Sequence, residues 1–201
     1  MPSLPTLAQT PERHPAPRRA LGPKQASTVE RLLTAVQAEL ALHPYDVVTM
    51  RTITKTAGVS VATGYAYFTS KDHLVAELLW RRYQAVSDPA EQEGTTTIDR
   101  VVAVLSNFAL LVADEPNLAH ACSMAVLAND PDVHLLRDLI GAETRRRLEL
   151  AGRGAVSPEM LTTLEHVVSG ALIRAGTGHV SYHELPEHLR TAAVLICKGV
   201  R

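Results

Sequence analysis

Apolar residues recur every three or four positions along most of the chain, which is the spacing of one buried helix face. In the first such run the apolar positions are Val29, Leu32, Leu33, Val36 and Leu40. We expect this helix to start near residue 27 and to end at His43, because Pro44 disfavours helical backbone at the residue before it.

Three further helices are predicted before residue 90, each preceded by a hydroxyl residue suited to the N-cap position. The capping residues are Thr49, Ser60 and Ser70. The helices are expected at about residues 50–57, 60–67 and 71–87. After a loop rich in Gly, Pro, Thr and acidic residues, helices are expected at about 97–113, 116–128, 132–151, 158–177 and 185–199. There is no sustained two-residue alternation that would indicate strands, so the predicted fold class is all-α.

Two short helices joined by a glycine-containing turn and followed by a long helix match the helix-turn-helix outline. Ala57 is small enough for the two short helices to cross closely, and Gly58 can take the left-handed backbone that ends a helix. Val59 would fill the small core between them. Ser60 would start the second helix, whose first half would enter the major groove of DNA.

The run from residue 49 to 79, TMRTITKTAGVSVATGYAYFTSKDHLVAELL, resembles the TetR family of bacterial transcriptional regulators. The resemblance implies a helix-turn-helix DNA-binding domain at about 26–72 and a larger helical ligand-binding and dimerisation domain at 73–201. It also implies a homodimeric repressor that a small-molecule effector releases from a palindromic double-stranded DNA operator. The scarcity of aromatic and buried-looking charged residues in the larger domain indicates that this effector is apolar. A DNA-binding regulator without such an effector is an open alternative.

Three positions depart from the family pattern T-V-R-x-I-A-x-x-A-G-V-S-x-G-T-L-Y-x-Y-F-x-S-K-E-x-L and its preceding helix. Gly64 replaces a leucine, Ala62 replaces a common glycine, and Pro44 replaces the glycine common at the end of the first helix. Glycine inside a helix costs roughly 0.5–1 kcal/mol relative to alanine. Gly64 would therefore either loosen the recognition helix or permit a close approach to another group.

The resemblance implies which side chains face DNA. Val61, Ala62, Thr63 and Tyr65 occupy positions that face the groove, and an apolar side chain there can contact a thymine methyl group. Tyr67 and Lys71 match positions that grip phosphate, and hydroxyl residues at helix starts can also contact phosphate. The expected DNA-binding residues in the folded domain are Thr49, Ser60, Val61, Ala62, Thr63, Tyr65, Tyr67 and Lys71. The alternative is that the tyrosines are core aromatics and the lysine is solvated.

The net charge of −1, from 20 basic and 21 acidic residues, hides an uneven distribution. Residues 26–90 hold 6 basic and 6 acidic side chains, and residues 91–201 hold 10 and 14. Residues 1–25 are rich in proline, are expected to be disordered, and carry 4 − 1 = +3. Arg18, Arg19 and Lys24 of this arm could reach the minor groove, although a solvated tail is equally consistent with the composition.

The candidate ligand-pocket residues in the larger domain are Trp80, Tyr83, Asn107, Phe108, Leu111, His120, Cys122, Met124 and Leu127. The same residues also fit an ordinary core. The last two helices offer small and apolar side chains for a dimer interface, or simply for covering the protomer core. The candidate interface residues are Ser169, Gly170, Ala171, Ala175, Ala192, Ala193 and Ile196.

Catalytic and metal-binding alternatives have little sequence support. His179, His183 and His188 are closely spaced but lie in a segment interrupted by glycine and proline, without a matching cysteine pair. Cys122 and Cys197 are too few for a disulfide framework, which fits a reducing cytoplasm. We expect no enzyme activity, no cofactor, no bound metal, no membrane contact and a cytoplasmic location, with a metal-dependent helical enzyme as the remaining alternative.

Overall fold

The computed structural model describes residues 22–87 and 95–198, and within these ranges the regular structure is entirely helical. The helices are α1 (Pro23–Leu42), α2 (Met50–Thr56), α3 (Val61–Tyr67), α4 (Lys71–Gln84), α5 (Thr97–Leu110), α6 (Pro116–Val126), α7 (Pro131–Gly152), α8 (Pro158–Gly176), the 3-10 turn η2 (Tyr182–Glu184) and α9 (Leu185–Lys198). The prediction of an all-α fold is therefore confirmed for the described residues.

The first helix starts earlier than the periodicity indicates. Gly22 is its N-cap and Pro23 occupies its first turn, where the missing N–H is no loss because first-turn N–H groups have no acceptor within the helix. The expectation that residues 23–25 belong to a disordered arm is therefore wrong, and Lys24 is an exposed residue of α1. Arg18 and Arg19 lie outside the described residues.

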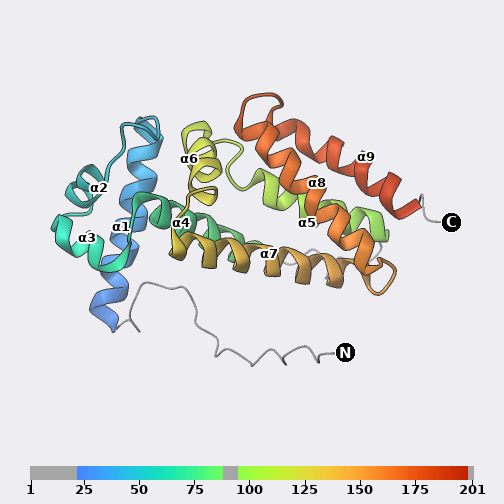
Figure 1. Ribbon diagram of the computed structural model, residues 1–201, viewed down its shortest axis with the longest axis horizontal. Coiled ribbons are helices and arrows are strands. Elements are labelled where there is room, and N and C mark those ends of the chain that lie inside the picture. Colours follow the sequence, from blue (N-terminus) through green and yellow to red (C-terminus); the bar gives the residue numbers. More distant parts are fainter. Residues whose placement is uncertain (1–21, 88–94, 199–201) are drawn as a thin grey trace, which may run out of the picture.

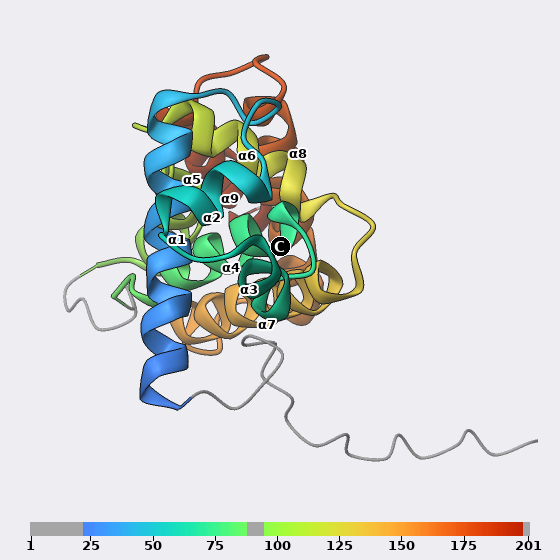
Figure 2. The same cartoon turned by 90° about the vertical axis from the view of Figure 1, so that its left-hand side faces the viewer.

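The helices form two groups joined by α4 and α7. Figure 1 shows α1, α2 and α3 at one end of the molecule and α5, α8 and α9 at the other, with α4 and α7 running between them. Figure 2, which looks at the end formed by α1 to α3, shows α2 and α3 in front of the remaining helices. This arrangement leaves one side of α2 and α3 uncovered.

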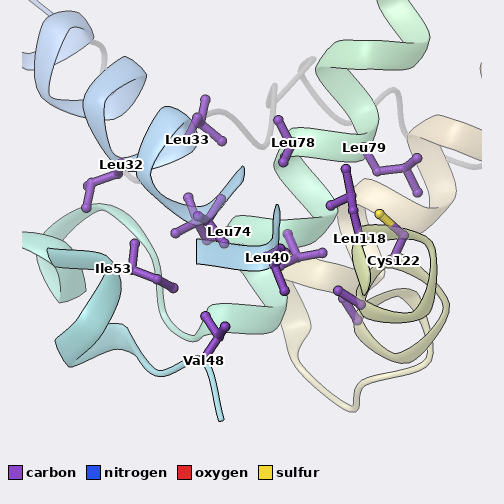
Figure 3. Packing of buried hydrophobic residues seen from close by; sticks show 14 of the residues in the cluster. Leu32, Leu33, Leu40, Val48, Ile53, Leu74, Leu78, Leu79, Leu118 and Cys122 are labelled. Carbon is purple, nitrogen blue, oxygen red and sulfur yellow. The ribbon is translucent and has the colours of Figure 1, made fainter. Parts of the chain in front are cut away.

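Buried apolar side chains form one core cluster at each end. The first cluster joins α1, α2, α4 and α6, and Figure 3 shows Leu40 of α1, Leu74 of α4 and Leu118 of α6 within it. The second cluster joins α5, the end of α7, α8 and α9. Helix α4 passes through the expected domain boundary at residue 72 without interruption, so the end formed by α1 to α3 shares its core with the helix that leads to the other end. Within the described ranges, none of the helices is both long and apolar enough to cross a membrane.

Candidate nucleic-acid interface

The two short helices begin at hydroxyl caps, as the sequence predicts. The Oγ1 of Thr49 accepts a hydrogen bond from the backbone N–H of Thr52 at 3.2 Å. The Oγ of Ser60 accepts one from the backbone N–H of Thr63 at 3.0 Å. Each bond satisfies a first-turn donor that has no acceptor within its own helix, so both helices have defined starting points.

The turn between these helices is held from α1. Gly58 has φ +63°, the left-handed backbone that glycine adopts at little cost. The guanidinium of Arg31 donates to the carbonyl oxygens of Ala57 and Gly58, at 2.9 Å for the second. A Cβ atom at position 58 would lie 2.9 Å from Nη2 of Arg31. No local sequence signal identifies this arginine, because its partners lie 26 and 27 residues away.

Gly64 is the point at which α3 rests on α2. It is buried, and a Cβ atom there would lie 2.5 Å from Cγ2 of Thr54 and 3.3 Å from Cε of Met50. The structure therefore resolves the two possibilities for this departure from the family pattern in favour of a close approach. The leucine common at this position would require the Thr54 side chain or α3 itself to move.

The exposed face of α3 consists of Val61, Ala62, Tyr65 and Ala66. Val61 is 40% exposed and Tyr65 is 49% exposed. Ala66 was not among the expected groove residues, although its position four residues after Ala62 places it on the same helix face. The four residues form two adjacent pairs, one helical turn apart, and all four are exposed.

Two of the expected contact residues on α3 are turned partly inward. Thr63 is half-buried, and its hydroxyl oxygen lies 2.8 Å from that of Ser60. Tyr67 is half-buried and packs against the first core cluster. Thr49 and Ser60 are themselves exposed, and each caps the start of its helix.

Lys71 is engaged within the domain. Its Nζ donates to the carbonyl oxygens of Tyr45 at 2.8 Å and Val48 at 3.1 Å, and lies 3.8 Å from the centre of the Tyr45 ring. Burial lowers the pKa of Lys71, and the charge of Asp46 partly opposes that shift. The lysine expected to meet phosphate therefore fastens the turn after α1 to the start of α4.

The turn between α3 and α4 is attached to the residue that caps the start of α7. Asp130 is the N-cap of α7, and its Oδ2 accepts hydrogen bonds from the hydroxyls of Ser70 at 2.6 Å and Thr69 at 3.0 Å. Burial raises the pKa of Asp130, but these bonds and one from the N–H of Asp132 outweigh it and leave the pKa below its usual value. A single carboxylate thus joins the end of the recognition helix to the larger domain.

The other end of α4 is attached to the same helix. Arg147 of α7 is 5% exposed, and it donates to the carbonyl oxygens of Tyr83 at 3.1 Å and Val86 at 3.0 Å. Its guanidinium also lies 4.5 Å from the centre of the Tyr83 ring, and the Tyr83 hydroxyl donates to Oγ1 of Thr144 at 3.1 Å. Helices α4 and α7 are therefore joined near both of their ends, as their parallel course in Figure 1 permits.

The expected ligand-pocket residues are not gathered around one space. Phe108 lines a hollow of about 390 Å³ between α5, α7 and α8. His120 lines a different hollow, of about 290 Å³, between α6 and the end of α8. Met124 is 49% exposed and Leu127 is 64% exposed, and neither of them lines either hollow.

The remaining expected pocket residues belong to packed regions. Tyr83 is fully buried and Cys122 is 4% exposed, and burial raises the pKa of the Cys122 thiol to about 12. Trp80, Asn107 and Leu111 are half-buried and line neither of the two hollows. Helix α6 buries Leu118, Ala119, Ala121, Cys122 and Ala125, so the side of α6 that meets the core is made mostly of small residues.

Two of the expected dimer residues are covered by their own chain. Ala175 is 7% exposed and Ala193 is 0% exposed, so neither is available to a second copy. Gly170 and Ser169 are exposed, whereas Ala171, Ala192 and Ile196 are half-buried. The large exposed apolar residues of this region are Ile173 and Leu195, at 52% and 69% exposed. Ile173 follows Gly170 by three residues, and Leu195 follows Ala192 by three. Residues three apart share a helix face, so this spacing could have identified both.

The histidine-rich segment before α9 forms no metal centre in the part of the chain that the structure describes. Across those residues there is no group of three or more His, Cys, Asp or Glu side chains that could hold a metal ion. Nδ1 of His179 lies 3.0 Å from the hydroxyl of Thr177, and Nε2 of His183 lies 3.3 Å from Oδ1 of Asp114.

Solved structures share this fold. A TetR transcriptional regulator from Rhodococcus sp. RHA1 superposes with a TM-score of 0.73 over 89% of this chain and 100% of its own, at 22% sequence identity. At that identity the likeness concerns the fold alone. The shared fold is a helix-turn-helix at one end of the molecule joined to a helical bundle.

Sequence comparisons extend the likeness to the family. The profile described as "Bacterial regulatory proteins, tetR family" matches residues 32–78. An "Uncharacterized HTH-type transcriptional regulator" of Mycobacterium tuberculosis is 38% identical over 181 residues, which cover 88% of this chain and 83% of that protein. The "HTH-type transcriptional repressor KstR" of Rhodococcus jostii is 28% identical over 56% of this chain and 53% of its own. The chain therefore belongs to the TetR family of bacterial regulatory proteins, the helix-turn-helix transcriptional regulators.

Proposed function

We propose that this transcriptional regulator is a repressor that binds operator DNA as a homodimer through α3 and is released by an apolar small molecule. The exposed face of α3, flanked by the exposed caps Thr49 and Ser60, is the observation that carries the proposal. The similarity to a protein named as a repressor supports repression rather than activation.

The homodimer would form through α8 and α9. Ile173 and Leu195 are large apolar side chains that stand exposed on these two helices, and exposed Gly170 permits a close helix crossing. Pairing the two helices with those of a second copy about a two-fold axis gives a four-helix bundle. Such a dimer would carry two copies of α3, which must lie about 34–36 Å apart to enter successive major grooves on one side of the duplex.

The effector would occupy the hollow between α5, α7 and α8. Its volume of about 390 Å³ is within the range of roughly 300–1,000 Å³ found for small-molecule sites. Phe108, Val168 and Leu172 give it apolar walls, and the ion pair between Arg145 and Glu165, 3.1 Å apart, lies among its lining residues. An apolar molecule with one polar group matches this lining.

Effector and operator would be coupled through α7 and α4. The hollow is lined by Ile140 and Thr144 of α7, the helix that holds α4 through Asp130 and Arg147. A ligand that changes the position of α7 would therefore change that of α3. Coupling of this kind is typically 1–3 kcal/mol and reciprocal, so the operator would weaken effector binding by the same factor.

Selection of genomic DNA fragments by the purified full-length chain tests operator binding. We expect a palindromic site with half-site centres about 10–10.5 base pairs apart, bound by a dimer. If no sequence is enriched over the genomic background, operator binding is refuted.

A thermal-shift screen with long-chain fatty acids and sterols, which are apolar molecules with one polar group, tests the effector. A compound that raises the melting temperature is expected to release the operator, and Leu172→Gln should abolish the shift while operator binding persists. Leu150→Gln, at a residue of α7 that is 46% exposed, is the matched control. An unchanged shift in Leu172→Gln would refute this location for the effector.

A further inference from the structure

The groove-facing side of α3 is unusual in its chemistry. Its four exposed residues, Val61, Ala62, Tyr65 and Ala66, include no side chain able to form a bidentate hydrogen bond with a base. Reading guanine requires Arg or Lys, reading adenine requires Asn or Gln, and cytosine is read by an acidic acceptor. The hydroxyl of Thr63 lies 2.8 Å from that of Ser60, so it is engaged at the start of the helix.

The base feature that remains open to such a surface is an apolar one. In the major groove the C5-methyl group of thymine is the apolar mark that distinguishes an A·T pair, and alanine and other apolar side chains contact it directly. We propose that α3 selects operators by thymine methyl groups, which Val61, Ala62 and Ala66 contact through their own methyl groups. The inference rests on the proposed binding of operator DNA through α3.

The shape of α3 fits this reading. Ala62 and Ala66 extend no further than Cβ, so the helix backbone must come close to the base edges for carbon atoms to meet at about 4 Å. A helix of 7 residues, about 10 Å long, can enter a groove about 12 Å wide. The Cβ atoms of residues four apart lie about 5–6 Å from each other, against a base-pair rise of about 3.4 Å. The two thymines read by Ala62 and Ala66 would therefore be one or two base pairs apart.

Tyr65 provides the polar contact on this face. It is 49% exposed, and it stands on α3 between the two alanine positions. Its hydroxyl can donate to a phosphate oxygen at the edge of the groove, a contact that fixes position but carries no sequence information. Affinity and selectivity are thus assigned to different residues, which makes them separable by mutation.

The test replaces thymine by uracil at each position of the selected operator and measures Kd by fluorescence anisotropy. Uracil pairs as thymine does and lacks only the methyl group. Loss of one buried methyl group should raise Kd about fourfold, and replacing thymine by uracil in both half-sites should raise it about 15-fold. In the reverse test, either cytosine or 5-methylcytosine is placed at an operator position that is sensitive to uracil. The operator with 5-methylcytosine should bind more tightly than the operator with cytosine.

At one operator position, Val61→Ala should reduce the ratio of the Kd with uracil to the Kd with thymine from about four to about one. The ratios at the other positions should stay unchanged. Alanine is a strong helix former, so this variant keeps α3 intact. Tyr65→Phe is the control. It should weaken binding to all sequences alike and leave the uracil-to-thymine ratio of Kd unchanged at every position. An operator made entirely with uracil that binds as tightly as the thymine form would overturn methyl reading while operator binding itself stands. Failure to select any sequence would overturn both.

Discussion

Gly64→Ala is a substitution for which helix propensity and packing predict opposite signs. Alanine in place of a helix-interior glycine stabilises a helix by about 0.8–1.0 kcal/mol. The new Cβ would, however, lie 2.5 Å from Cγ2 of Thr54, where carbon atoms in contact are about 3.5–4.0 Å apart. Overpacking of this kind costs typically 1–3 kcal/mol. We therefore expect a net loss of about 1 kcal/mol, which lowers Tm by about 2–4 °C.

Thr54→Ser provides the background in which the sign should reverse. Serine removes Cγ2 and keeps the hydroxyl, which donates to the carbonyl oxygen of Met50 at 2.8 Å. In this background Gly64→Ala should raise Tm by about 2–4 °C, because the propensity gain remains and the collision is gone. The coupling energy of the cycle should be about 1–3 kcal/mol.

Thermal unfolding followed by circular dichroism at 222 nm measures all four members of the cycle. Operator affinity provides a second measurement, because displacement of α3 should weaken binding in Gly64→Ala and spare it in the double variant. If Gly64→Ala raised Tm equally in both backgrounds, the close approach of α3 to Thr54 would not constrain position 64. The account given for the glycine would then be wrong.

Three further variants, two single and one double, test separate contacts. Lys71→Met should lower stability by about 2 kcal/mol in urea unfolding, because two carbonyl oxygens lose a charged donor; unchanged stability would show that the lysine is not structural. Asp130→Asn should destabilise at pH 7. The pKa of Asp130 is lower in the folded state than in the unfolded state, where it is about 3.9. The stability that its carboxylate contributes is therefore fully present above about pH 3.9 and is lost as the pH falls through the folded-state pKa. Urea unfolding between pH 7 and pH 3 should thus show the gap to wild type closing, and a constant gap would contradict this. Ile173→Asp with Leu195→Asp should give monomers by sedimentation analysis, whereas Leu150→Asp should not; a persistent dimer would place the interface elsewhere.

Local signals account for the part of the fold that could be predicted. The caps Thr49, Ser60 and Ser70 act on N–H groups three residues later, so the starts of α2, α3 and α4 can be identified from sequence alone. Gly58 similarly takes the backbone that its turn requires. These interactions depend on neighbours in the chain, and the helix-turn-helix was therefore predicted correctly.

The contacts that sequence reasoning missed join residues far apart in the chain. Arg31 holds a turn 26 residues away, and Asp130 accepts hydrogen bonds from Ser70, which lies 60 residues earlier. Met124 of α6 was a candidate pocket residue, yet it is 49% exposed. Met124 is apolar and correctly spaced, but Ala125 is the residue that packs inside. Periodicity identifies an amphipathic helix and does not say which neighbour approaches it, because that depends on the tertiary arrangement.

The double attachment of α4 to α7 has a mechanical consequence. A helix fixed to its neighbour near both ends cannot tilt independently, so the pair must rotate as one body or lose the hydrogen bonds at Asp130 or Arg147. Helix α4, with 14 residues, is about 21 Å long, and a rotation of about 5° moves one end by about 2 Å relative to the other. In a two-fold dimer both copies would move in opposite directions. The separation of the two recognition helices would then change by about 4 Å, more than one base-pair rise of roughly 3.4 Å, so a small rotation of α7 has enough leverage to spoil the fit to the operator.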